Sequence, residues 1–212
     1  MPNKKSIILY LCVFLLIAGG VFVYNNYYYK AKVINLPGAS SPTEETDATS
    51  TANDYNTLMT LGLEQKAKGD MGDRASYDKA IETFSLIIKN TESKYWLPYL
   101  NLGNTYSSVG NFVEADKAYA KAMEISGGGE ITVYQSRIDS WFFDPTKKPE
   151  EIKKLYEEAI ANVYDNVNLI KGYAGYLRDR GDKAEAIVQF KVLAEMFPEK
   201  DVYKEEIRNL GN

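Results

Sequence analysis

The chain has 212 residues, with 25 basic and 29 acidic side chains, no histidine and one cysteine. A chain without histidine lacks the commonest general base and metal ligand, and one cysteine forms neither an internal disulfide nor a zinc-binding pair. Every acidic residue follows Lys32, so the part of the chain after Lys32 holds 21 basic and 29 acidic residues. Its formal net charge of −8 disfavours nucleic acid and anionic lipid as partners.

Residues 6–24 form an uncharged segment that consists mostly of Ile, Leu, Val and Phe. A helix of this length spans roughly 28 Å at about 1.5 Å per residue, enough to cross the hydrocarbon core of a bilayer. Lysines at 4 and 5 precede the segment, and four tyrosines between 24 and 29 follow it, a composition suited to the membrane–water interface. We therefore predict a flank over residues 1–5 and a transmembrane anchor over residues 6–29, with residues 6–24 in the lipid bilayer.

A cleaved signal peptide is the competing interpretation of this segment. Signal peptides have shorter apolar stretches, about 7–15 residues, that end at small residues. Small residues do occur at Ala18-Gly19-Gly20, but the apolar run continues to Tyr24, which favours an uncleaved anchor. Cys12 lies inside the run without small residues before it, which disfavours a lipoprotein. The flanking lysines slightly favour a cytoplasmic N-terminus and an extracytoplasmic domain.

Residues 30–54 are predicted to be a flexible linker. From Pro37 onward this segment is rich in Ser, Thr, Ala and acidic residues, with almost no bulky apolar residue. Such a composition buries too little apolar surface to order itself. Residues 55–212 then remain for a single folded domain, which is long enough to bury a core.

A repeat motif lies at the centre of the predicted domain. It reads Tyr99-x-x-Leu102-Gly103-x-x-Tyr106, then Gly110, then Ala115-x-x-x-Tyr119-x-x-Ala122. This pattern resembles the tetratricopeptide repeat (TPR) family, whose unit is a 34-residue helix–turn–helix. The resemblance implies that Gly103 and Ala115 let two antiparallel helices approach closely while Tyr119 fills the groove between them. One such hairpin cannot bury its apolar face alone, so neighbouring hairpins are expected.

The signature of the second helix recurs four times at offsets of 35, 37 and 34 residues. The four copies are Ala80/Phe84/Ile87, Ala115/Tyr119/Ala122, Ile152/Tyr156/Ala159 and Ala186/Phe190/Leu193. In the first copy the turn between Gly69 and Tyr77 is roughly six residues longer than the pattern requires. The sequence thus predicts an all-α fold: a TPR-like α-solenoid of about four helical hairpins plus a C-terminal capping helix, with one N-terminal transmembrane helix.

Local signals place the later helices. The apolar stripe of the third hairpin falls outside clean TPR register and consists of Ile131, Tyr134, Ile138 and Trp141. The capping helix over residues 201–210 has its own apolar stripe, which consists of Val202, Tyr203, Ile207 and Leu210. Asp144-Pro145 is predicted to end one helix, because the residue before proline avoids the α region, and Pro149 to begin the next. Gly181 is expected to provide a left-handed turn residue, and Pro198 to follow the end of the fourth hairpin.

The resemblance implies that the first helices of the hairpins line a groove that receives a peptide or partner segment. Counting along the repeats places several first-helix residues there: Leu97, Leu100, Asn104, Ser107, Arg137, Trp141, Asn168, Lys171, Gly175 and Arg178. Of these, Asn104, Arg137, Lys171 and Arg178 form the candidate site, a polar and locally basic strip for a carboxylate or an acidic peptide. The alternative is that they are ordinary exposed polar residues. The aromatic run Trp141-Phe142-Phe143 is read as packing between hairpins rather than as a binding patch.

Nothing in the sequence indicates catalysis, so no catalytic, cofactor or metal residues are assigned and no small-molecule substrate is expected. Adjacent carboxylates such as Glu150-Glu151 point about 100° apart on a helix and are not aimed at one substrate. The sequence therefore predicts a non-enzymatic, membrane-anchored scaffold that holds a protein or peptide near the membrane. This layout is similar to that of membrane-anchored prokaryotic TPR proteins, some of which assist secretion or envelope assembly. A cytoplasm-facing TPR adaptor and an accessory subunit of a membrane-bound enzyme complex are the alternatives.

Overall fold

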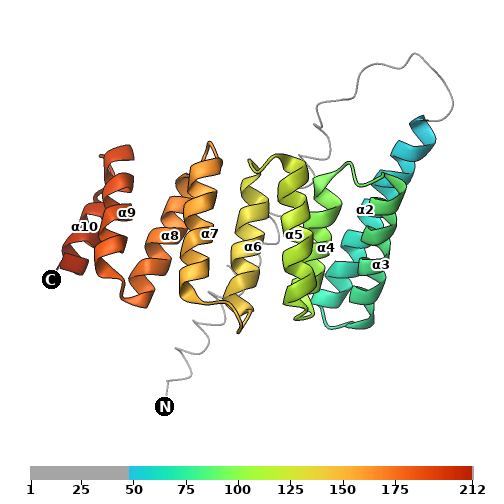
Figure 1. The fold of residues 1–212 in the computed structure, drawn as a ribbon, viewed down its shortest axis with the longest axis horizontal. Helices are drawn as coiled ribbons and strands as arrows, with labels where there is room; N and C mark the ends of the chain where they lie inside the picture. Colours follow the sequence, from blue (N-terminus) through green and yellow to red (C-terminus); the bar gives the residue numbers. More distant parts are fainter. Residues whose placement is uncertain (1–47, 212) are drawn as a thin grey trace, which may run out of the picture. The chain divides into compact units, whose positions relative to one another are not determined.

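The computed structural model describes residues 48–211, and this part of the chain is entirely helical (Figure 1). Its nine helices are α2 (Ala48–Asp70), α3 (Ala75–Asn90), α4 (Trp96–Ser108), α5 (Phe112–Ser126), α6 (Ile131–Phe143), α7 (Pro149–Asn162), α8 (Val167–Arg180), α9 (Lys183–Met196) and α10 (Asp201–Gly211). The predicted transmembrane segment, residues 6–24, lies outside the described residues. Among the described helices, none is long and apolar enough to cross a membrane.

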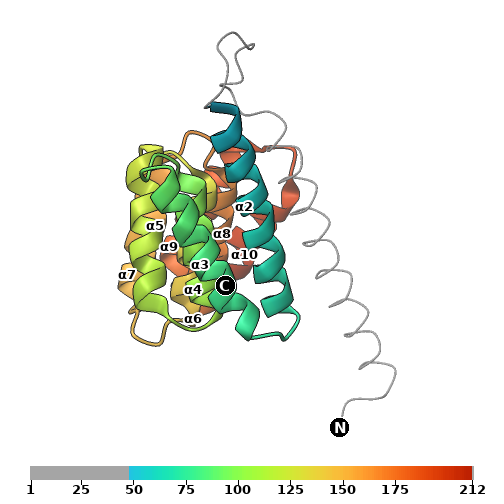
Figure 2. The same ribbon diagram turned by 90° about the vertical axis from the view of Figure 1, so that its right-hand side faces the viewer.

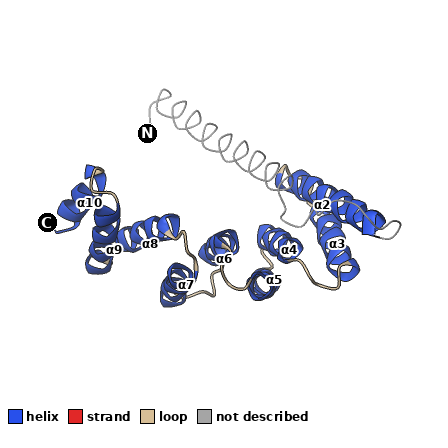
Figure 3. Cartoon of the chain, turned by 90° about the horizontal axis from the view of Figure 1, so that it is seen from above, coloured by secondary structure: helices blue, strands red, loops and turns tan. Residues whose placement is uncertain are grey.

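Each described helix packs against the next one in the chain, so the helices form consecutive antiparallel hairpins (Figures 1 and 2). The hairpins are α2/α3, α4/α5, α6/α7 and α8/α9, and α10 packs on α9. The even-numbered helices lie along one side of the row and the odd-numbered helices along the other (Figure 3), and α4 also touches both α2 and α6. The expected four hairpins and capping helix are therefore present.

Glycines permit the close approach of the two helices in the first two hairpins. A Cβ atom added at Gly103 on α4 would lie 2.7 Å from the ring of Tyr119 on α5, and one at Gly62 on α2 would lie 2.6 Å from the ring of Phe84 on α3. Both distances are too short for real atoms, so only glycine fits. The turn of the first hairpin is not roughly six residues too long, contrary to the sequence prediction: residues 71–74 separate α2 from α3, against residues 109–111 between α4 and α5, so most of the extra residues lengthen the two helices.

The third hairpin departs from this arrangement, as its weak match to the repeat suggested. Tyr156 on α7 stacks on Tyr173 of α8, with ring centroids 5.1 Å apart, and its hydroxyl lies beside Gly172. Its ring thus packs on the next hairpin. Ser140, which occupies the place of Gly103 when counted back from the aromatic residue, is buried at 3% exposure and carries a side chain where the first two hairpins have glycine.

The turns follow the local signals. Helix α6 ends at Phe143, and α7 begins at Pro149, where the backbone N–H of Lys148 donates to the Glu151 carboxylate at 2.9 Å. Gly181 adopts a φ of 84° after α8, a value that a Cβ atom would strain. In α10, Tyr203, Ile207 and Leu210 pack on the core as expected. Val202 does not: its side chain is 54% exposed, because it lies on the outer side of the helix.

The first helix of the array begins at Ala48, earlier than the predicted domain start at residue 55. Residues 48–54, read as linker from their composition, continue directly into α2. All the described residues, 48–211, belong to one compact unit.

Candidate functional site

The four predicted site residues all lie on even-numbered helices, Asn104 on α4, Arg137 on α6, and Lys171 and Arg178 on α8. We call the side of the row formed by α2, α4, α6, α8 and α10 the even face (Figure 3). It is the side on which the resemblance placed the groove. Leu100, expected in that groove, is instead buried at 1% exposure, because it packs against α5 in the core.

Arg137 is held by its own chain. Its Nε donates to Asp116 Oδ1 on α5 at 2.7 Å, and the same carboxylate oxygen accepts from Trp141 Nε1 at 2.8 Å. The Arg137 guanidinium and the Lys147 ammonium both lie over the Trp141 ring, 4.9 and 4.0 Å from its centroid. This cluster fastens α6 to α5, so the Arg137 charge serves an ion pair within the fold.

Arg178 is also paired within the chain. Its Nη1 donates to Glu206 on α10 at 2.8 Å and its Nε to Asp179 at 2.9 Å. The first of these contacts ties α8 to the capping helix. Lys171 has a different environment: its Nζ lies 5.6 Å from the centroid of the Phe197 ring. In the basic strip, Arg137 and Arg178 are therefore paired with carboxylates of the same chain. Lys171 lies near the Phe197 ring.

Asn104 takes part in the contact between α4 and α5. Its Oδ1 accepts a hydrogen bond from the Tyr119 hydroxyl at 2.9 Å. Burial raises the pKa of Tyr119 well above its usual range, and the nearby carboxylates of Asp139 and Asp116 raise it further, against hydrogen bonds from Ser107 and Ser140. The Tyr119 hydroxyl is therefore protonated at neutral pH and can donate to Asn104.

Sequence reasoning missed two residues of the even face, Asp139 on α6 and the hydroxyl of Tyr156. The burial of Tyr156 raises its pKa to about 12, with a further contribution from the charge of Asp139. The Asp139 charge thus acts on tyrosines of two hairpins, Tyr119 and Tyr156. One signal could have identified Asp139: it lies on the polar side of α6, opposite the stripe Tyr134, Ile138 and Trp141.

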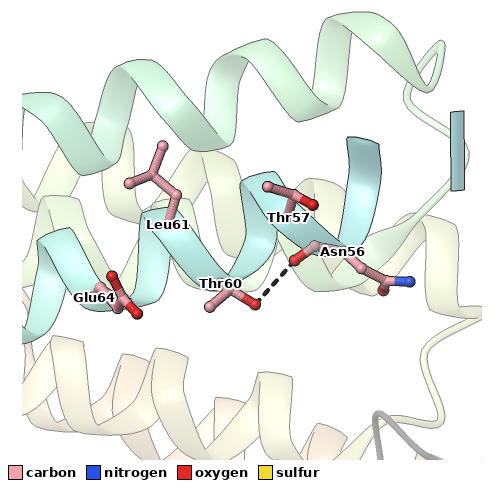
Figure 4. A pocket seen from close by; sticks show the side chains of 5 residues that line it. All are labelled: Asn56, Thr57, Thr60, Leu61 and Glu64. Carbon is pink, nitrogen blue, oxygen red and sulfur yellow. Dashed lines mark hydrogen bonds between the residues drawn. The ribbon is translucent and has the colours of Figure 1, made fainter. Parts of the chain in front are cut away.

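A pocket on the even face is lined by one helix only. Its residues are Asn56, Thr57, Thr60, Leu61 and Glu64 of α2 (Figure 4). The Thr60 hydroxyl donates to the Asn56 carbonyl at 2.9 Å, so it is already used within the helix. Within the described residues there is also no group of three or more Cys, Asp and Glu side chains that could hold a metal ion.

Comparison with solved structures identifies the fold. The crystal structure of the MamA protein, a TPR-like helical protein, superposes with a TM-score of 0.53 at 18% sequence identity, over 75% of this chain and 81% of MamA. The described domain has a TPR-like fold. No protein-family model matches the sequence, and no curated protein matches it.

The comparison bears on the fold alone, because identity is low. The predicted all-helical, TPR-like architecture is confirmed. Membrane anchoring through residues 6–24, the extracytoplasmic location and the partner-binding role of Asn104, Arg137, Lys171 and Arg178 remain predictions.

Proposed function

We propose that this protein is a non-catalytic scaffold whose even face binds a segment of a partner protein. The observation that supports the proposal is the stacking of four hairpins with their first helices on one side of the row, a side that can receive an extended or helical segment. On α6, Asp139 is exposed to solvent and makes no ion pair within the described residues, so its carboxylate is accessible to a partner. An arrangement of this kind binds rather than transforms what it holds.

As part of the same proposal, residues 6–24 anchor the chain in a membrane, with the helical domain on the extracytoplasmic side. The support is the uncharged apolar run and its tyrosine-rich flank. Tethering raises the local concentration of the domain, so weak contacts on the even face would suffice to hold a partner there. Protease treatment of sealed membrane vesicles checks the orientation, because a cytoplasm-facing adaptor would be cleaved from the opposite side.

Site-specific photocrosslinking tests the scaffold proposal. A photoreactive amino acid at Gln135, one helical turn before Asp139 on α6, should crosslink to a partner in the native membrane. The same amino acid at Lys191, exposed on α9 at the opposite side of the row, provides the matched control and should give no such product. Equal crosslinking from both positions, or crosslinking only from Lys191, would contradict binding at the even face.

A further inference from the structure

The turns within the hairpins all lie along one edge of the row, the lower edge in Figure 1. This follows from the fold, because successive antiparallel hairpins place these turns at one end of the helices and the loops between hairpins at the other. The turns are residues 71–74, 109–111, 144–148 and 181–182, and the loops are residues 91–95, 127–130, 163–166 and 197–200. We call the two ends the turn edge and the loop edge.

The turn edge exposes large apolar side chains in three successive hairpins. They lie in the turns or within two residues of them, and they are Met71, Val109, Val113, Phe142 and Phe143. Met71 is 80% exposed and Phe143 is 77% exposed. Single exposed apolar residues are common on protein surfaces, but their recurrence along one edge indicates a surface that contacts something apolar.

Phe143 was expected to be covered by the protein itself, because the aromatic run at residues 141–143 is read from the sequence as packing between hairpins. Phe142 does contact α8, since its ring centroid lies 5.3 Å from that of Tyr176. For Phe143 the prediction is wrong: it is the last residue of α6, and most of its surface is exposed. The Phe143 side chain is therefore available for a contact outside the domain.

The charges at the turn edge are compatible with an apolar neighbour. The three carboxylates in the turns each have a partner in the chain, and these pairs are Asp73 with Ser76, Asp144 with Thr146, and Asp182 with Lys153. The turns hold three basic and three acidic residues, a formal charge of zero, whereas the loops hold two basic and four acidic residues, a formal charge of −2. Arg74 and Lys148 of the turn edge are exposed, and such long side chains can lie along an apolar surface while their charged ends stay in water.

The proposed anchor can bring the turn edge to the membrane. Helix α2 runs from the loop edge to the turn edge, and its 23 residues make it about 35 Å long. Residues 25–47 connect the apolar segment 6–24 to α2, and a chain of this length reaches at most roughly 80 Å. The connection is therefore long enough for the turn edge to touch the bilayer. It also keeps the domain concentrated beside the bilayer, so weak contacts suffice.

We propose that the turn edge lies on the membrane surface, with Met71 and Phe143 inserted between the lipid headgroups and the acyl chains. The inference rests on the proposed anchoring by residues 6–24. Removal of apolar side chains from water supplies the attraction, so the contact does not require anionic lipid. In this arrangement the helices stand upright on the bilayer, and the even face is open sideways to a partner segment.

Depth-dependent quenching of a fluorophore tests this contact in the full-length chain. Cys12 is the only cysteine in the sequence, so a Cys12→Ala protein accepts one labelled cysteine, placed by Phe143→Cys at the turn edge or by Tyr164→Cys at the loop edge. Both proteins are reconstituted into phosphatidylcholine vesicles that carry a nitroxide quencher either near the headgroups or at the bilayer centre. We expect quenching at position 143, stronger with the shallow nitroxide, because interfacial insertion reaches a depth of about 5–10 Å. Tyr164 is fully exposed, and the dye at its position should be quenched by neither.

A second set of variants tests whether the turn edge acts as one surface. With the dye at position 143, Met71→Glu should weaken the quenching, because a carboxylate introduced in the neighbouring part of the edge must lose water to enter the bilayer. Leu86→Glu is the matched control: it adds the same charge at an exposed apolar position of α3, about three helical turns from the turn edge, and should leave the quenching unchanged. Circular dichroism confirms that each variant is folded.

Several results would overturn the membrane contact. These are equal quenching at positions 143 and 164, quenching at 164 alone, and no quenching at either position. A dye at 143 that is shielded from water but not quenched by lipid would show that a protein or a second copy of the chain covers the edge instead. Flotation of the vesicles tests the anchor separately. Protein that does not float contradicts both the anchor and the contact, whereas floating protein with an unquenched dye at 143 removes the contact and leaves the anchor in place.

Discussion

Asp116 and Asp139, on neighbouring helices, have opposite electrostatic environments. Replacing each by asparagine should therefore have opposite effects on stability. Burial opposes the ionisation of Asp116, but the hydrogen bond and charge of Arg137, with contributions from Trp141 and Lys147, outweigh it and lower its pKa. Asp139 has burial without any compensating cation, so its pKa is raised. The first carboxylate therefore stabilises the folded state when ionised, and the second destabilises it.

Replacing Asp116 by asparagine should destabilise the protein at neutral pH. The substitution removes the charge that holds Arg137 and Trp141 on α5, and we expect a loss of about 1–3 kcal/mol in the free energy of unfolding. Because the folded pKa of Asp116 lies below the unfolded value of 3.8, its contribution is complete above that value and is lost as the pH falls through the folded pKa. Chemical denaturation at pH 7 and near pH 3 measures both. An equal loss at the two pH values would show that packing, not charge, is responsible.

Replacing Asp139 by asparagine should raise the melting temperature at pH 7. The folded pKa of Asp139 is above the unfolded value of 3.8, so its cost to stability appears as the pH rises through 3.8 and is complete above the folded pKa. Below 3.8 wild type and variant should melt alike. Thermal unfolding at the two pH values checks this, with Glu195→Gln, which removes one carboxylate charge from an exposed site on α9, as the control. A lower melting temperature of the variant at pH 7 would mean that the Asp139 carboxylate stabilises the fold. A carboxylate that serves binding is instead expected to cost stability.

At the scale of the element, glycine has opposite consequences in two helices of the same row. Gly103 on α4 faces the Tyr119 ring with no room for a Cβ atom, whereas Gly175 on α8 faces open space. Helix propensity disfavours both residues equally. Packing therefore requires the first glycine, and the second is required by nothing within the described fold.

Gly103→Ala and Gly175→Ala form a matched pair. The first should cost about 1–3 kcal/mol, because the Tyr119 ring must move away from a Cβ atom that would lie 2.7 Å from it. The second should be neutral or stabilise the protein by up to about 1 kcal/mol, because alanine is the better helix former. Urea denaturation of both variants provides the free energies. A stable Gly103→Ala protein would contradict the close packing of α4 on α5.

The sequence predicts the elements better than their contacts. Gly103 opposite Tyr119 could be predicted, because the repeat fixes both positions within one hairpin. The stacking of Tyr156 on Tyr173 of α8 could not, because repeat spacing does not specify which rings of neighbouring hairpins meet. The pairing of Arg137 with Asp116 joins two hairpins, and repeat spacing alone does not specify which surface charges meet. The unpaired state of Asp139 is likewise a property of the assembled row.

At the scale of the whole described domain, stability comes from contacts between successive hairpins. In such a row each hairpin is supported by its neighbours, so a terminal hairpin needs a cap with a polar outer side. Helix α10 fits this requirement: Tyr203, Ile207 and Leu210 face the core, while Lys204 and Glu205 face solvent. The ion pair between Arg178 and Glu206 adds a contact between the cap and α8. Part of the proposed basic strip is thus engaged in holding the end of the row.

Removal of residues 201–212 should therefore unfold the row from its C-terminal end. Without α10, the apolar sides of α8 and α9 meet water and Arg178 loses Glu206, so amide protons of these two helices should exchange faster with solvent. Those of α4 and α5, two hairpins away, should keep nearly their original protection, because coupling passes through neighbouring contacts. Hydrogen exchange read by mass spectrometry measures every helix in one experiment. A shorter truncation that removes only residues 211 and 212 provides the control and should leave protection unchanged. Equal loss of protection in all helices would instead mean that the row of hairpins unfolds as one cooperative unit. Binding at the even face would then depend on the capping helix as strongly as on α6.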